Sequence, residues 1–483
     1  MSGARVVPWR TLLRLELGLL VADRSVRGVL IFFALVLATS AWLGGRHARE
    51  HAEAIARAAD AQSATVAASL AAVRELGAGP AMPLSATDPR DPALAGRERA
   101  VVLAHLPPTP LASVSAGLRD VRSHALRVTT GAQLAQSLSS ATALVGPSRQ
   151  ATGALDPAFV LVVLFPLVVI ALSYDLLSGE RERGTLALVL SQPVSQTRLV
   201  AAKAIARALV LLGSGVGTAW LGVALTGGEL FGASGWPRTL AYTAGIVAYG
   251  TFWFSLAVWI NARGAASLRN VLVLMACWLG LTVIVPGLLR AWVETRFPPP
   301  SRVELINDAR EAAEEAEAQL GALEGSHGPA AATPADPLTP TQRAAALEEE
   351  LARRTEPVVA SFREQLEAQQ RWVSACQYVS PAVVLQELLN DAAGTGSHRQ
   401  SRFERQVDAF HAQWRRYFAE KVALGQPLSA ADYAAMPRFH FDEEPTGAFA
   451  RRIGLGLAGL LGPAMLLLLT AMPGLRRVGR LSP

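Results

Sequence analysis

The charged residues best suited to bind a partner lie between residues 180 and 203. Glu180, Arg181, Glu182 and Arg183 are consecutive, and this run stands between two apolar segments. A charge inside hydrocarbon costs about 2.5–3.5 kcal/mol on insertion scales, so the run is expected at a membrane surface. Charges at such a surface mainly set partner choice and association rate. On the charge pattern alone, this run either contacts something on that side of the membrane or is a solvated loop with positive-inside charge. The residues considered with it are Gly184, Thr185, Leu186, Pro193, Arg198 and Lys203.

Residue patterns for catalysis or for metal binding are weak or missing. His47 and His51 are four residues apart, but a catalytic zinc site needs three protein ligands. A Gly-x-Ser-x-Gly nucleophile elbow is absent from the sequence. The nucleotide-binding pattern Gly-x-x-x-x-Gly-Lys-Ser/Thr is also absent, and the chain has only two lysines, Lys203 and Lys421. We therefore predict no catalytic residue, no metal and no cofactor in this chain.

The composition indicates a membrane protein. Of the 483 residues, 51% are hydrophobic and 17% are charged, and the mean hydropathy is +0.29. A soluble domain is about 25% charged. The net charge is +6, but the basic residues flank apolar segments instead of forming one patch, which argues against nucleic acid as a partner.

Six segments are long enough to cross a bilayer, which takes roughly 17–25 apolar residues. Residues 8–25 precede the first segment, and their apolar positions recur at helical spacing. This pattern suits a helix lying in the membrane interface, or an extension of the first span, and the sequence leaves both open. The six predicted spans are 27–45, 158–177, 204–226, 239–260, 270–290 and 453–473.

The distribution of arginine predicts the orientation of the spans. Basic clusters before span one, between spans two and three, between spans four and five, and after span six all fall on one side, which marks the cytoplasm. We predict an all-α polytopic protein of the bacterial cytoplasmic (inner) membrane, with both termini cytoplasmic. The predicted divisions are 1–45 (interfacial helix and span one), 46–157 (extracytoplasmic), 158–290 (spans two to five, with a coupling helix at 178–200), 291–452 (extracytoplasmic) and 453–483 (span six and tail).

The two extracytoplasmic regions are expected to be largely helical. Region 291–452 has apolar positions in steps of three and four on either side of a Gly/Ala/Pro linker at 325–340, which predicts an antiparallel helical hairpin, with a kink at Pro357. Asp156-Pro157 and Ser380-Pro381 each place a capping side chain before a proline, which predicts a helix start at both sites.

Small and basic residues within the spans carry further expectations. The pairs Gly213/Gly217 in span three and Gly456/Gly459 in span six predict close helix packing. Lys203 lies near the cytoplasmic end of its span, where a long side chain can reach water. The spans lack a carboxylate or histidine at mid-membrane depth, which disfavours a proton-coupled carrier.

The run around Glu180 resembles the signature that follows the second helix of ABC type-2 permeases, the membrane subunits of ATP-binding-cassette exporters. That signature is an acidic-x-acidic-x-Gly-Thr run, an apolar strip, a Ser-x-Pro-Val-Ser turn and a lysine. The matching residues here are Glu180, Glu182, Gly184, Thr185, Leu186, Ser191, Pro193, Ser195 and Lys203.

A second resemblance covers the extracytoplasmic regions. The segment 378–389, from Tyr378-Val379-Ser380-Pro381 onward, looks like an ABC permease subfamily with two enlarged extracytoplasmic loops, and 110–117 fits the first loop of that group. Members of that subfamily often carry tyrosines where Arg122-Ser123-His124-Ala125 stands here.

The resemblance implies a permease that works as a homo- or heterodimer with cytoplasmic ATPase subunits, which bind ATP and Mg²⁺. Helix 178–190 would be the coupling element, with Glu180 and Glu182 facing basic groups of the ATPase. Reversing both charges would then uncouple the ATPase. The alternative is a membrane-anchored envelope scaffold whose extracytoplasmic helices bind partner proteins.

Overall fold

The computed structural model describes residues 8–77, 88–117, 124–131, 156–184, 196–225, 235–296 and 340–478, with shorter stretches within 227–232 and 306–318. In this part of the chain, six helices are long and apolar enough to span a membrane. Each overlaps one predicted span, so the number and order of the apolar helices agree with the prediction. They are Arg24–Leu76, Pro157–Glu182, Thr197–Leu225, Trp236–Asn261, Ser267–Arg296 and Thr446–Leu475.

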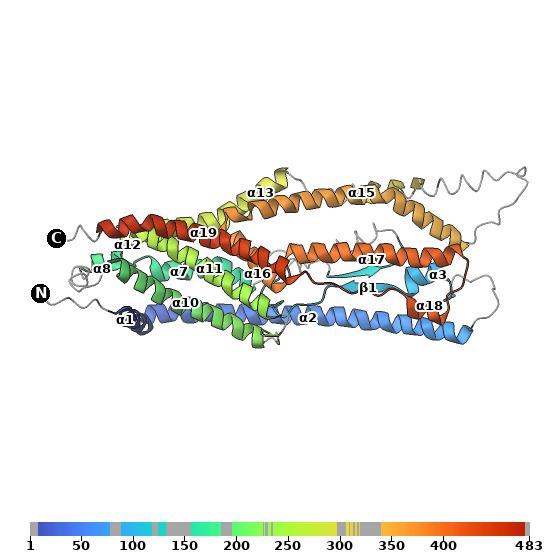
Figure 1. Ribbon diagram of the computed structural model, residues 1–483, viewed down its shortest axis with the longest axis horizontal. Coiled ribbons are helices and arrows are strands. Elements are labelled where there is room, and N and C mark those ends of the chain that lie inside the picture. The colour runs from blue at the N-terminus through green and yellow to red at the C-terminus, as the bar shows by residue number, and fades with distance from the viewer. Residues whose placement is uncertain are drawn as a thin grey trace, which may run out of the picture.

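These helices form a bundle at one end of an elongated molecule (Figure 1). Its centre is α11 (Trp236–Asn261), which packs against α7 (Phe165–Ser173). The fully buried aromatic rings of Phe165, Tyr249 and Trp253 fill the contact. Around them stand α10 (Gln196–Leu225), α16 (Pro381–Ala393) and α19 (Thr446–Val478).

A proline gives the second span an irregular backbone. The span begins with α6 (Pro157–Phe159), continues as a π-helical turn, η2 (Val160–Leu164), and then becomes α7. Pro166 has no N–H to donate to the carbonyl four residues earlier, that of Val162. The hydroxyl of Tyr249 donates to this carbonyl at 2.9 Å, so α11 supplies a donor where the ordinary α-helical partner is missing.

Glycines allow close helix contacts, though not at all the predicted places. A Cβ on Gly456 or Gly459 would lie 2.7 or 2.6 Å from the side chains of Leu388 or Tyr378, which confirms the packing role predicted in span six. The prediction for Gly213 and Gly217 is wrong within this chain, because nothing lies within 4 Å of either position. Span three instead approaches α2 through another glycine, Gly222, which faces Ala41.

The segment before span one forms its own helix, α1 (Trp9–Ala22). Asp23 has an extended backbone (ψ 119°), and its carboxylate accepts the backbone N–H of Ser25 at 2.8 Å, which caps α2 (Arg24–Leu76). In Figure 1, α1 is seen nearly end-on while α2 runs along the molecule. The break at Asp23 therefore excludes a straight extension of span one.

The fifth span, α12 (Ser267–Leu279), η3 (Gly280–Ile284) and α13 (Val285–Arg296), is the least covered of the six. Only 6% of its most apolar window is buried inside this chain, against 72% for span four. Its apolar outer face thus remains open to lipid or to another protein.

At the other end, α2 continues past residue 45 into a polar lobe, which we define as the described parts of 50–131 and 397–441. The lobe contains α3 (Pro92–Leu94), η1 (Ala95–Arg99), α17 (Ser397–Ala423) and α18 (Ala430–Ala435). It also has an antiparallel strand pair, β1 (Val102–His105) and β2 (Ala125–Val128), with Val102 opposite Val128. The all-α prediction missed this pair. The core of the lobe is built mainly by Phe403, Trp414 and Phe418 of α17 with Leu126 and Val128 of β2.

In the second polar region, α15 (Pro340–Cys376) is followed along the chain by η4 (Gln377–Val379) and then by α16. The helix α15 is continuous through Pro357, and Arg354 pairs with Glu315 of the 306–318 stretch, as a helical hairpin requires. The linker 325–340 lies almost wholly outside the described residues. Both predicted caps are confirmed: Asp156 accepts the N–H of Phe159 at 2.7 Å, and Ser380 accepts that of Val383 at 3.4 Å.

Candidate functional site

The charged run follows span two as a short elbow. After α7 ends at Ser173, the chain turns through 174–177 and forms α8 (Ser178–Glu182). Gly184 then adopts φ +70°, a left-handed conformation that favours glycine. The helix predicted at 178–190 ends at Glu182 in the structure, where Arg183 and Gly184 form a turn. Thr185, Leu186 and Pro193 lie outside the described residues.

A buried amide network holds the base of the elbow. The amide nitrogen of Asn261 donates to the carbonyl of Ser173 at 3.1 Å, and that of Asn270 donates to the carbonyl of Tyr174 at 3.2 Å. The two asparagines are 1% and 0% exposed. They come from the end of span four and the start of span five, so three spans meet where α8 begins. The sequence analysis missed them, although two asparagines beside apolar spans were a usable signal.

Two ion pairs connect the elbow to span three. Lys203 Nζ lies 2.7 Å from Glu180 Oε1, with side chains 8% and 13% exposed. Arg207 Nη1 lies 3.1 Å from Asp175 Oδ1 and also donates to the carbonyl of Leu172. The expectation that Lys203 reaches water is wrong, because its ammonium ends on Glu180 inside the protein. Glu180 is therefore an internal partner of span three in this structure.

A third carboxylate reaches this cluster from α1. Leu12, Glu16 and Leu20 are spaced by four residues and are all buried, and α1 packs on α10. Burial raises the pKa of Glu16, and the positive charges of Lys203 and Arg207 oppose that rise. The N-terminal helix thus adds a charged group to the buried side of the elbow. The sequence analysis did not find Glu16, although a lone acid on the buried face of α1 was the available signal.

The outer side of the elbow is exposed. Arg181, Glu182, Arg183 and Gly184 are all exposed. Glu182 has a second role, because its carboxylate accepts the backbone N–H of Ser267 at 2.7 Å at the start of α12. Of the other predicted residues, Arg198 is exposed on α10. The elbow therefore has an internal face that binds neighbouring spans and an external face rich in arginine.

Histidines, cysteines and acids are the side chains that could bind a metal ion. Among the described residues, no group of three or more His, Cys, Asp or Glu side chains could hold a metal ion. His51 lies against the ring of His124, with centroids 5.5 Å apart, in an edge-to-face contact. The chemistry that the elbow offers is charge recognition on its outer face.

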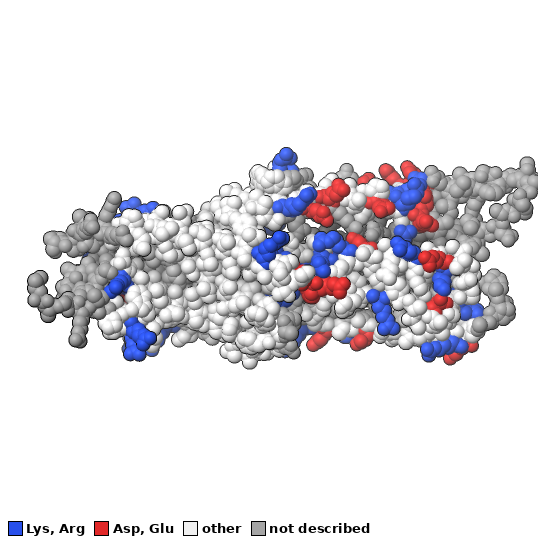
Figure 2. Space-filling view, viewed as in Figure 1, with Lys and Arg blue, Asp and Glu red and all other residues white. Residues whose placement is uncertain are grey.

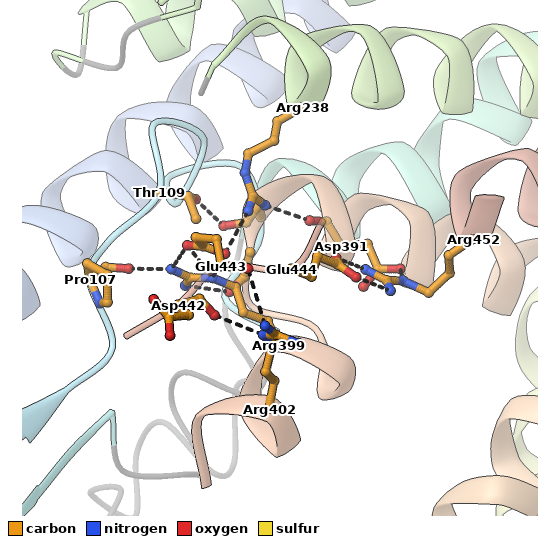
Figure 3. Close-up of polar contacts among 12 residues, drawn as sticks. Pro107, Thr109, Arg238, Asp391, Arg399, Arg402, Asp442, Glu443, Glu444 and Arg452 are labelled. Atoms are coloured by element: carbon orange, nitrogen blue, oxygen red, sulfur yellow. Dashed lines mark hydrogen bonds and ion pairs between the residues drawn. The ribbon is translucent and has the colours of Figure 1, made fainter. Parts of the chain in front are cut away.

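A second charged site lies at the waist, where the polar lobe joins the bundle (Figure 3). Arg452 at the start of α19 lies 2.6 Å from Asp391 and 2.5 Å from Glu444. Burial alone would raise the pKa of Glu444, but its hydrogen bond to Arg452 and the positive charge of that residue hold the pKa below its usual range. Arg452 is therefore fully matched by acids.

Two further arginines complete this waist clasp. Arg399 of α17 pairs with Glu443 and donates to the carbonyl of Pro107 at 2.8 Å. Arg238 of α11 lies 3.5 Å from Glu443 and donates to the carbonyl of Asp391 at 3.1 Å. The clasp therefore ties both polar regions to spans four and six.

Comparison with known families finds two matches. Residues 143–283 match the family described as ABC-2 family transporter protein. Residues 302–442 match a domain of unknown function, DUF3526. No curated protein matches the chain. The first match contains spans two to four, the elbow and most of span five, and the second contains α15, α16, α17 and α18.

Proposed function

Because residues 143–283 match the ABC-2 transporter family, we propose that this chain is a permease subunit that exports a substrate across the bacterial cytoplasmic membrane, driven by a separate ATPase. Proteins of this family are membrane subunits without catalytic activity of their own. In this proposal ATP and Mg²⁺ bind to the partner subunit, and the chain supplies the path and the coupling element.

The attachment of α8 to three spans carries the coupling proposal. Lys203 links it to span three, Ser267 links it to span five, and Asn261 fixes its base to span four. A push on the exposed face of Arg181 and Arg183 would therefore reach several spans at once. Interiors are close-packed and transmit displacement, so such an elbow suits the transfer of motion from an ATPase.

The distribution of charge supports an elbow on the cytoplasmic side. In Figure 1, α8, α1 and the C-terminal end of α19 lie at the same end of the molecule. Figure 2 shows a nearly uncharged surface over the bundle, with isolated blue residues at that end and mixed charges over the lobe. This pattern agrees with the positive-inside rule. We propose that the lobe is extracytoplasmic.

A second permease chain belongs to the same proposal. The fifth span leaves large apolar side chains exposed, among them Leu268, Leu272 and Leu288. In span three, Gly213 and Gly217 also face open space. Small residues let helices approach closely in a bilayer, so these faces are candidates for contact with another copy or with a related permease.

The test reverses the exposed charges of the elbow. We expect Arg181→Glu/Arg183→Glu in the full chain to abolish co-purification of an ATPase from native membranes, while the protein still inserts. The matched control is Arg415→Glu/Arg416→Glu on α17, the same change of charge in the lobe. Reversal of Glu180 is a poorer test, because it also breaks the buried pair with Lys203.

Retention of the ATPase by the elbow variant at the control level would refute the coupling role. A wild-type protein that purifies with an envelope protein and without any ATPase would favour the membrane-anchored scaffold instead. The polar lobe, with its own apolar core, is the part that would bind such a partner.

A further inference from the structure

A cavity of about 520 Å³ opens at the waist between α15, α16, α17 and α19. It is a different site from the elbow, which lies at the far end of the bundle (Figure 1). Its volume falls in the range of pockets that hold small organic ligands, roughly 300–1,000 Å³. The chemistry of its walls indicates what such a ligand would be.

The wall toward the bundle is apolar. Val383, Val384 and Leu388 of α16 line it together with Gly456 of α19. At Gly456 a Cβ would lie 2.7 Å from the side chain of Leu388, so the two helices are in direct contact there. This wall can accept a hydrocarbon chain, and it lies on the side of the membrane spans.

Among the charged residues that line the cavity, Glu387 is the most buried one that forms no ion pair with another described residue. Arg452 also lines the cavity, but its guanidinium is held between Asp391 and Glu444 at 2.6 and 2.5 Å. Glu387 is partly buried and has no ion pair among the described residues, and it takes a hydrogen bond from Asn390. A partly buried carboxylate without a cation is costly, so this position favours a positively charged ligand.

The rim of the cavity is charged but faces water. Arg371 of α15 and Arg405 of α17 are exposed, as are Glu367 and His398. Exposed charges of both signs are screened by solvent and salt. They therefore influence a ligand less than Glu387, which lies deeper in the same cavity.

We propose that the waist cavity binds an amphiphile whose head carries a protonated amine, with Glu387 as its counterion and the wall of Val383, Val384 and Leu388 as the seat of its chain. A carboxylate–ammonium contact is a charge-assisted hydrogen bond, which is about twice as strong as a neutral one. Binding to the isolated chain requires no ATPase and no transport, so the proposal stands apart from the proposed function.

The affinity of the cavity for an amine should depend on pH in a way that identifies the Glu387 carboxylate. Burial, together with the negative charge of Asp391, raises the pKa of Glu387 to about 7, against the lowering effects of Asn390 and Arg452. Besides Asp391 and Arg452, the other titratable groups on the cavity walls are Glu367, Arg371, Tyr378, His398 and Arg405. Glu387 becomes a carboxylate as pH rises, so affinity for an amine is expected to increase between pH 6 and pH 8.

The experiment uses the full chain in phosphatidylcholine nanodiscs and isothermal calorimetry with three soluble probes, octylamine, octanol and octanoate. We expect octylamine to bind at least about tenfold more tightly than octanol at pH 8, and less tightly at pH 6. Glu387→Gln should remove the difference between amine and alcohol. Val383→Phe, which fills the cavity without changing charge, should weaken both probes.

Glu420→Gln on the exposed face of α17 is the matched control, and empty nanodiscs measure partition into lipid. The proposal is overturned if octanoate binds as tightly as octylamine, which would assign the cavity to anions through its arginines. It is also overturned if Glu387→Gln, folded with an unchanged melting temperature, binds octylamine like the wild type.

Discussion

The buried ion pair between Glu180 and Lys203 allows a quantitative prediction of how much stability is lost when either charge is removed. Its Oε1 and Nζ atoms are 2.7 Å apart, and both side chains are nearly enclosed. Removing one partner of a buried pair costs roughly 3–5 kcal/mol, because the other charge stays buried without compensation. Arg207 and Glu16 lie in the same cluster, so either remaining charge is partly balanced. We therefore expect about 3 kcal/mol for each of Glu180→Gln and Lys203→Met.

The double variant Glu180→Gln/Lys203→Met removes both charges. Replacing a buried pair by neutral groups is often close to neutral, so its loss should be about 1 kcal/mol or less. The expected coupling energy is then about 5 kcal/mol when the two single losses are compared with the double loss.

Thermal unfolding of the purified full chain measures these losses. A change of 1 kcal/mol shifts Tm by roughly 2–4 °C in a domain of 150–250 residues, so each single variant should lose about 6–12 °C at most. In the double variant, most of this loss in Tm should be absent. Arg290→Met/Glu294→Gln on α13, an exposed pair at 2.8 Å, is the control and should move Tm by less than about 2 °C. Single losses that add up in the double variant would refute the reasoning.

Two further predictions concern the bundle and the waist. Tyr249→Phe removes the donor to the Val162 carbonyl and should cost about 1–3 kcal/mol, read as a lower Tm; an unchanged Tm would show that the carbonyl has another donor. Glu387 has a pKa raised from 4.5 to about 7, so the folded state holds a proton that the unfolded state loses between those values. Stability should therefore fall as pH rises from about 4.5 to 7, by at most roughly 3–4 kcal/mol. Glu387→Gln should flatten that part of the Tm–pH profile, and an unchanged slope would contradict the assignment.

Local signals in the sequence were enough to predict the spans and the helix starts. Hydropathy over about 20 residues is set by composition alone, and all six spans lie where it placed them. Asp156 and Ser380 cap their helices as predicted, because a cap depends on residues three positions apart.

The candidate site was only partly visible in the sequence. The charged run predicted an elbow at a membrane surface, and Arg181, Glu182 and Arg183 are exposed there. The sequence also assigned Glu180 to an outside partner, whereas it faces Lys203, 23 residues later. Asn261 and Asn270 were missed, because their partners Ser173 and Tyr174 lie 88 and 96 residues earlier in the chain.

By itself, the sequence determined a membrane chain of six spans with a charged elbow after the second and two long polar regions. Tertiary structure alone decided which charges pair inside, such as Glu16 near Lys203 and Arg452 with Asp391, and which face outward. The physical reason is that hydropathy and capping act within a few residues, while the cost of burying a charge depends on groups that folding brings from distant segments.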